Sequence, residues 1–81
     1  MMQINEDDFP TFQIKSYGKA ELAAIYLPRV SVLSAKKTFR GWIAHHPTLL
    51  SELKATGLHN KSKIYTPLQV KLIISAFGEP G

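Results

Sequence analysis

Residues 35–43 have the sequence Ala-Lys-Lys-Thr-Phe-Arg-Gly-Trp-Ile, and this stretch decides the fold that we expect. Wound as a helix, it has one apolar side, which consists of Ala35, Phe39, Trp42 and Ile43. A different side carries three positive charges, on Lys36, Lys37 and Arg40. Such a helix packs its apolar side on a small core and leaves its basic side for solvent or for an anionic partner, most simply the backbone of a nucleic acid.

The composition indicates one small globular domain. Of the 81 residues, 44% are apolar, which is too large a share for a disordered chain. There is no cysteine, so neither a disulfide framework nor a thiolate metal site is available, and packing alone must stabilise the fold. No apolar run approaches the roughly 18 residues of a membrane span, and the opening residues do not resemble a signal peptide. We therefore expect a cytoplasmic protein that does not enter a membrane.

Positive charge is concentrated in the part of the chain that we expect to fold. The formal net charge is +4, but three of the six acidic residues lie within the first ten positions. Residues 9–78 contain ten basic residues against two acidic ones, Glu21 and Glu52, which gives a net charge of +8. Such an excess favours polyanionic partners and raises their rate of encounter. The expected organisation is a flexible acidic leader at 1–10, a single domain at 11–78 and a short tail at 79–81.

The order of periodic segments predicts a mainly helical domain with a small β-hairpin and about four helices. Residues 11–15 alternate between apolar and polar side chains, with Phe12 and Ile14 on one side, and this predicts a short strand. Residues 58–65 have a polar centre between apolar ends, so we expect a β-hairpin, or wing, in which Ile64 can pair with the first strand. Helical periodicity is found in four segments, at 18–26, 32–45, 47–56 and 67–77.

Capping residues mark the ends of these predicted helices. The N-caps that we expect are Ser16, Ser31 or Ser34, His46 and Thr66, with Pro47 and Pro67 at the first helical positions. Gly57 and Gly78 are placed as the left-handed residues that close the last two helices. Gly41 stands in the middle of the second helix, where glycine costs about 1 kcal/mol relative to alanine. We interpret Gly41 as a position of close helix packing beside Trp42; the alternative is the close approach of a ligand backbone.

The arrangement of these elements predicts a winged helix-turn-helix-like fold. A first helix, a turn that contains Pro28 and a second helix with an outward basic side follow one another directly. In helix-turn-helix proteins the second helix enters the major groove while the first crosses the backbone. The predicted hairpin occupies the place of a wing that contacts phosphates, and Lys61 and Lys63 lie in it.

Several motifs resemble those of a family of short bacterial proteins of unknown function, abundant in gut Bacteroides-type bacteria. The shared motifs are SYGKAELA at 16–23, Trp42-Ile43 followed by a proline, YTPLQV at 65–70 and FGEP at 77–80. The resemblance extends over nearly the whole chain, from Phe12 to Pro80. It implies no established activity.

A more distant similarity is to winged-helix proteins of the mercury-resistance-regulator and phage-excisionase type. The similar motifs are Glu21-Leu22-Ala23, Thr38-Phe39-Arg40 with Trp42, and Tyr65-Thr66, in the same order along the chain. This chain departs from that type in two ways, because its turn after the first helix is longer and a whole helix at 47–56 precedes the wing. The similarity implies a winged fold and, by analogy of fold alone, DNA binding.

The first functional hypothesis is therefore a small DNA-binding protein that regulates transcription or a mobile element. The residues that we expect to contact nucleic acid are Lys19, Lys36, Lys37, Arg40, Lys61 and Lys63. Of the three cations on the second helix, Arg40 alone can grip a guanine edge with two parallel hydrogen bonds, while Lys19, Lys61 and Lys63 suit phosphates. So small a module would bind weakly, which favours a homodimer or a second protein as an additional partner.

The alternative hypothesis is a protein-interaction adaptor, such as an anti-repressor, built on the same fold. It rests on apolar residues beyond those that the core needs. Leu68 and Leu72 lie off the main apolar stripe of the last helix, and we expect Ile25 or Val30 to be partly exposed. Small domains often leave such residues uncovered, however, so these positions alone do not identify an interface.

We do not expect an enzyme. His45 and His46 are adjacent, so on a helix their side chains diverge by about 100° and do not readily chelate one ion. The third histidine, His59, lies in the predicted wing. The folded part has no paired carboxylates and no glycine-rich phosphate loop. We accordingly expect no cofactor, no metal ion and no small-molecule substrate.

Overall fold

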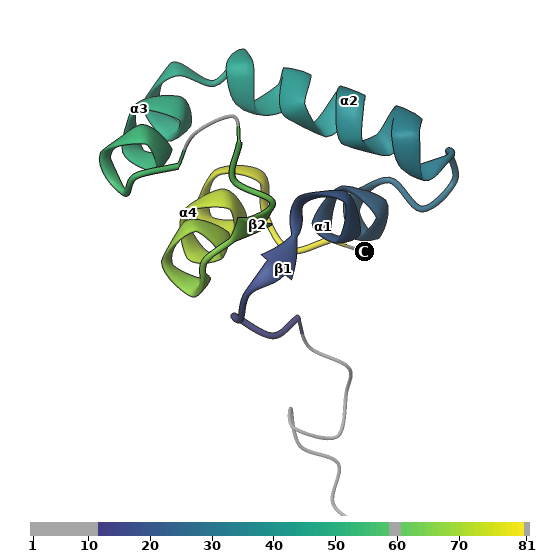
Figure 1. Ribbon diagram of the computed structural model, residues 1–81, viewed down its shortest axis with the longest axis horizontal. Helices are drawn as coiled ribbons and strands as arrows, with labels where there is room; N and C mark the ends of the chain where they lie inside the picture. Colours follow the sequence, from purple (N-terminus) through teal and green to yellow (C-terminus); the bar gives the residue numbers. More distant parts are fainter. Residues whose placement is uncertain (1–11, 59–60, 81) are drawn as a thin grey trace, which may run out of the picture.

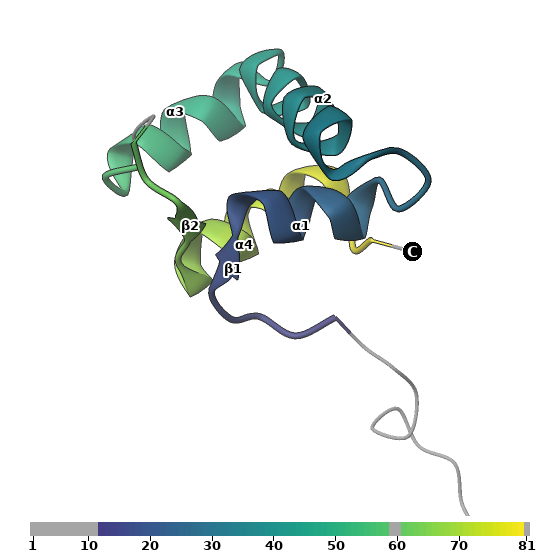
Figure 2. The same cartoon turned by 45° about the vertical axis from the view of Figure 1, so that its right-hand side comes forward.

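A computed structural model describes residues 12–58 and 61–80 of the chain. These residues form β1 (Tyr17–Gly18), α1 (Lys19–Tyr26), α2 (Val32–Ala44), α3 (Pro47–Ala55), β2 (Ile64–Tyr65) and α4 (Pro67–Phe77) (Figure 1). The prediction of a mainly helical fold is confirmed. In both Figure 1 and Figure 2, α2 runs along the top of the molecule, with α1 and α4 below it and α3 at its end. None of the helices in the described ranges is long and apolar enough to cross a membrane.

The two strands are short and come from distant parts of the chain. They pair antiparallel, with Tyr17 opposite Tyr65 and Gly18 opposite Ile64. The pairing continues for one more hydrogen bond, because the N–H of Lys19 donates to the carbonyl oxygen of Lys63 at 3.0 Å. The small sheet therefore fixes the segment before β2 against the beginning of α1.

The small antiparallel pair of strands is confirmed, and Ile64 pairs with a strand near the N-terminus as expected, but that strand is Tyr17–Gly18 instead of 11–15 and the local hairpin is not formed as predicted. In the described part of 11–15 there is no strand, because the chain folds back there: the Tyr17 hydroxyl donates to the carbonyl oxygen of Gln13 at 2.9 Å. The Phe12 ring stacks on the Tyr17 ring with centroids 5.1 Å apart. Within 58–65, the described residues form only β2, and its partner is β1 instead of a second strand of a local hairpin. His59 and Asn60, the centre of the predicted wing, lie outside the described residues.

Local capping contacts explain where three of the helices begin, as predicted. The Ser31 hydroxyl accepts from the N–H of Ser34 at 3.2 Å, and Nδ1 of His46 accepts from the N–H of Leu49 at 3.1 Å. At α4, Thr66 and Gln69 form a reciprocal capping box.

The first helix begins differently from the prediction. Its N-cap is Gly18 and not Ser16, because Gly18 is also the last residue of β1 and the helix starts where the strand ends. The Glu21 carboxylate accepts from the N–H of Gly18 at 3.1 Å. Pairing with β2 thus decides where α1 begins.

A buried glutamine connects α3 to α4. Only 4% of the Gln69 surface is exposed. Its Nε2 donates to the Thr56 hydroxyl at 2.9 Å, and its Oε1 accepts from the N–H of Thr66 at 2.9 Å. Thr56 in turn donates to the carbonyl oxygen of Leu53 at 2.6 Å. This chain of hydrogen bonds satisfies the buried side-chain amide of Gln69 where the end of α3 meets the beginning of α4.

The glycines behave in two ways. Gly57 and Gly78 have φ angles of 95° and 83°, so they close α3 and α4 in the left-handed region, as predicted. Gly41 does not mark close helix packing, because a Cβ added there would meet nothing within 4 Å. The interpretation of Gly41 as a packing contact is therefore wrong.

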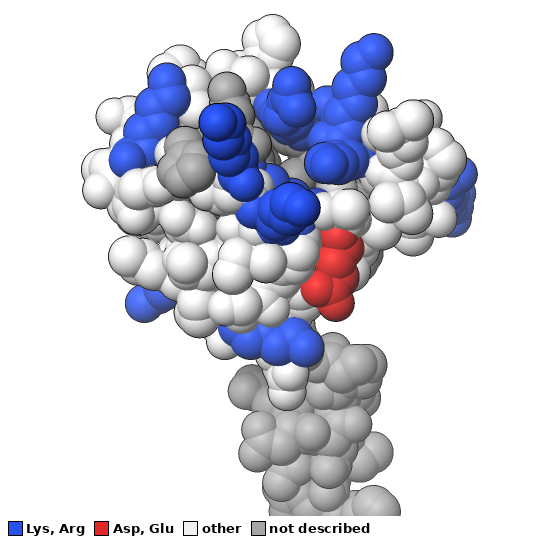
Figure 3. All heavy atoms as spheres, in the orientation of Figure 1, with Lys and Arg blue, Asp and Glu red and all other residues white. Residues whose placement is uncertain are grey.

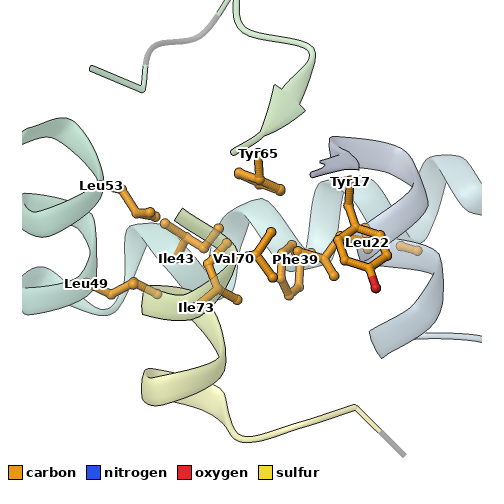
Figure 4. Close-up of a cluster of buried hydrophobic side chains, with 11 residues drawn as sticks. Tyr17, Leu22, Phe39, Ile43, Leu49, Leu53, Tyr65, Val70 and Ile73 are labelled. Carbon is orange, nitrogen blue, oxygen red and sulfur yellow. The ribbon is translucent and has the colours of Figure 1, made fainter. Parts of the chain in front are cut away.

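The core lies between α2 and the other elements, as Figure 4 shows for nine labelled side chains. Its buried members are Tyr17, Leu22, Ala23, Ala35, Phe39, Ile43, Leu49, Leu53, Tyr65, Val70 and Ile73. Phe39 is at the centre of an aromatic group, with ring centroids 5.0 Å from Tyr26, 5.9 Å from Phe77 and 6.4 Å from Tyr65. Trp42 remains 39% exposed, so it flanks the apolar side of α2 instead of forming its centre.

Candidate nucleic-acid interface

An open hollow of about 1020 Å³ lies between the beginning of α1, one flank of α2, the end of α3 and the segment before β2. We call it the basic hollow, because six of its lining residues are cations: Lys19, Lys36, Arg40, Lys54, Lys61 and Lys63. Glu21 is the single acidic residue among the described residues that line it. Figure 3 shows basic side chains gathered over the upper half of this face, with acidic atoms at the lower edge of the group.

Helical spacing explains how α2 contributes to this hollow. Lys36 and Arg40 are four residues apart, so they lie above one another on the same flank of the helix. Phe39 and Ile43, on the adjoining inner side, form part of the apolar wall below them. The predicted outward cations of α2 therefore stand directly beside the core.

Lys37 is placed differently from Lys36 and Arg40. One residue further along a helix is about 100° further around its axis, and Lys37 does not line the basic hollow. It lines instead a shallower depression of about 320 Å³, together with Leu33, Lys36 and Arg40. Because these four exposed residues follow one another along α2 and line this depression, we call them together the α2 ridge. The structure thus brings all three predicted cations of α2 together on the ridge, but only two of them at the hollow.

Burial and the neighbouring positive charges both affect the ionisation of Lys19. Burial lowers the pKa of Lys19, and the nearby charges of Arg40 and Lys36 lower it further. Its Nζ lies 5.8 Å from the centroid of the Tyr65 ring, a cation–π contact. Burial raises the pKa of Tyr65 to about 12, although Arg40 acts in the opposite direction. Lys19, Arg40 and Tyr65 consequently form one electrostatically linked group at the inner side of the hollow.

The two lysines predicted for a wing also reach the hollow, by another route. Lys61 and Lys63 line it from the segment that precedes β2. That segment is fixed by the bond between the Lys63 carbonyl oxygen and the N–H of Lys19. Contact between this segment and the beginning of α1 thus replaces the predicted hairpin tip as the feature that positions these charges.

Lys54 is the cation that the sequence reasoning missed. It lies in the last turn of α3 and lines the basic hollow with Leu50 and Leu53. The available signal was the spacing of Leu50 and Lys54, which are four residues apart and share a side of the helix. Nothing local, however, indicates that this side of α3 faces the flank of α2.

Other polar side chains have structural roles. His46 caps α3, and Nδ1 of His45 lies 2.8 Å from the carbonyl oxygen of Gly41. No group of three or more histidine, aspartate or glutamate side chains within 12–58 and 61–80 could hold a metal ion. The chemistry that the hollow offers is therefore positive charge and hydrogen-bond donors beside an apolar wall, which suits the binding of a polyanion.

Comparison with known proteins identifies a family. No curated protein and no solved structure matches the chain. Residues 13–80, most of the 81-residue chain, match DUF4248, which is described as a domain of unknown function. The chain therefore belongs to the DUF4248 family.

Proposed function

We propose that this protein binds DNA, with the basic hollow and the α2 ridge as its contact surface. The observation that carries this proposal is the convergence of six cations from α1, α2, α3 and the segment before β2 on one hollow that has one acidic lining residue. Cations spread over four parts of a chain come together in this way only through the tertiary fold. A solvated basic side of a single helix would not gather them.

The physical basis of binding is neutralisation of phosphates. Each lysine or arginine that neutralises a phosphate releases condensed counterions, and this supplies affinity that falls steeply with salt. Contacts of this kind fix the position of the protein on the duplex, whereas contacts to base edges specify the sequence. Lys19, Lys61 and Lys63 suit the first role, and Arg40 suits the second because its guanidinium can form two parallel bonds to guanine.

The arrangement of the helices supports a winged helix-turn-helix interpretation. Helix α1 packs on α2 across the turn at 27–31, and the basic side of α2 faces outward. The segment with Lys61 and Lys63 lies beside the beginning of α1, because the N–H of Lys19 donates to the Lys63 carbonyl oxygen, and in the order of elements it occupies the place of a wing. The intervening α3 distinguishes this chain from that type and adds Lys54 to the same face.

The alternative function, a protein-interaction adaptor, is supported by one observation. Apolar side chains that the adaptor hypothesis named are exposed, namely Ile25, Val30 and Leu68. Leu72, by contrast, packs partly against the core. A concentration-dependent mass in light scattering, or binding to an acidic protein in the absence of DNA binding, would favour the adaptor.

Anisotropy of a labelled random duplex, titrated with the full chain over a series of salt concentrations, tests the proposal. We expect binding at low salt that weakens linearly in a plot of log K against log salt. Absence of binding at about 20 mM salt, where a basic DNA-binding protein binds most tightly, would reject the proposal.

A further inference from the structure

The most exposed large apolar side chain in the described ranges lies among cations. Leu33 is 79% exposed. On α2 it lies three residues before Lys36, four before Lys37 and seven before Arg40. These four residues line the shallow depression on this side of the helix. A leucine at this position contributes nothing to the core, because Ala35, Phe39 and Ile43 are the residues of α2 that are buried.

The backbone position of Leu33 is fixed by the fold. It is the second residue of α2, directly after the turn that the Ser31 hydroxyl closes by accepting from the N–H of Ser34. The cap orders the backbone of the first turn, so the Cβ of Leu33 has a fixed place on the helix. The backbone is therefore ordered before any ligand arrives, which reduces the entropic cost of a contact there.

The surroundings of Leu33 determine what can cover it. A second copy of this chain would bring an identical set of cations against Lys36, Lys37 and Arg40, and the repulsion would oppose such a dimer. A ligand that complements these four residues instead presents an apolar group flanked by negative charge. In the major groove of DNA, the C5-methyl group of thymine lies between two phosphate backbones and offers this combination.

We propose that Leu33 contacts a thymine methyl group in the major groove, so that the ligand is thymine-containing DNA and not RNA. This inference rests on the proposed function. Leu33 and Arg40 are seven residues apart, which is about 10 Å along a helix axis. That length corresponds to about three base-pair steps when the helix follows the groove. A recognised site accordingly contains a thymine for Leu33 and a guanine for Arg40 about three base pairs away.

The test begins with duplexes selected from a random pool by the full chain. Each thymine of a selected site is then replaced singly by deoxyuridine, which removes only the methyl group, and the Kd is measured at constant salt. We expect one position at which the replacement weakens binding about fourfold, the change that corresponds to burial of one methyl group. Leu33→Ala should abolish this dependence while leaving the salt slope unchanged.

Lys37→Gln is the matched control, because it alters the ridge without altering Leu33. It should weaken binding to thymine and deoxyuridine duplexes equally, so that their ratio of about four is retained. Leu33→Gln, which keeps the size of the side chain but not its apolar character, repeats the test if the alanine variant fails to fold. Trp42 fluorescence reports on folding in each variant.

Two results would overturn the inference while DNA binding stands: selected sites in which no deoxyuridine replacement matters, or a full methyl dependence that persists in both Leu33 variants. Failure of the proposed function has a different signature, since no duplex would then be enriched and no binding would be found at low salt. In that case the inference fails together with the function on which it rests.

Discussion

Nζ of Lys19 lies 5.8 Å from the centroid of the Tyr65 ring, so the first residue of α1 contacts the last residue of β2. The backbone supports the same contact through the bond from the N–H of Lys19 to the carbonyl oxygen of Lys63. This small sheet brings Lys61 and Lys63 beside the cations of α2. Without it, the basic hollow would have no wall on the side of β2.

Alkaline stability should depend on Tyr65. Its folded pKa of about 12 lies above the ordinary value of 10.0, so the folded state retains a proton that the unfolded state releases. The associated stability is fully present below pH 10 and is lost as the pH rises toward 12. Urea unfolding over this interval should show a smaller loss of unfolding free energy in Tyr65→Phe, which has no phenol to ionise.

Two neighbouring groups modify this pH dependence. Tyr26 acts in the same direction, because burial and then Glu79 raise its pKa. Lys19 acts in the opposite direction as the pH approaches 10.5, because its lowered pKa lets the folded state release its proton first. If Tyr65→Phe and the wild type lose stability in parallel from pH 10 to pH 12, the assignment to Tyr65 is wrong.

Gly41→Ala should stabilise the protein by up to about 1 kcal/mol, because alanine is a better helix former. Gly41 lies inside α2, and an added Cβ would meet nothing within 4 Å. Gly57→Ala is the matched contrast. Its φ of 95° is unfavourable for a residue with a Cβ, so we expect a loss of about 1–2 kcal/mol. Thermal unfolding of the two variants measures both effects, and a destabilising Gly41→Ala would show that α2 is packed more closely there.

Gln69→Ala should lower the unfolding free energy by about 1–3 kcal/mol, because it removes a buried side chain together with its two hydrogen bonds to Thr56 and Thr66. Thr56 would lose its donor from Gln69, and the N–H of Thr66 would lose its acceptor. Gln13→Ala, at an exposed position, serves as the control for the loss of a glutamine. Equal urea midpoints for the two variants would contradict the role of Gln69 in connecting α3 to α4.

The helices were predictable because their signals are local. The N-caps Ser31, His46 and Thr66 each hydrogen-bond to a backbone N–H three residues away, and the prolines after His46 and Thr66 need no long-range partner. The strands were not predictable in this way. Each contains two residues, and what makes them strands is pairing between Tyr17–Gly18 and Ile64–Tyr65, which are far apart in the sequence.

The candidate site shows the same division between local and long-range information. Helical spacing predicts that Lys36 and Arg40 share a flank, and both line the basic hollow. Spacing cannot show that the end of α3 faces that flank, so Lys54 was missed. The spacing also groups Lys37 with Lys36 and Arg40. In the structure, however, Lys37 lines the shallow depression and not the basic hollow.

The central claim is that cations lining the basic hollow bind the phosphates of DNA. The most direct measurement compares the salt dependence of duplex binding in the wild type, in the double variant Lys36→Gln/Arg40→Gln and in Lys71→Gln. Lys71 is exposed on α4 and does not line the hollow, so its variant controls for the loss of positive charge.

For the wild type we expect a slope of log K against log salt of about −4 to −5, which corresponds to roughly four to six phosphate contacts. The double variant should bind more weakly, with a slope shallower by about one for the lost Lys36 phosphate contact and a further loss of affinity from the missing Arg40 contact to a base, whereas Lys71→Gln should retain the wild-type slope. A double variant that binds with the same affinity and slope as Lys71→Gln would contradict the claim.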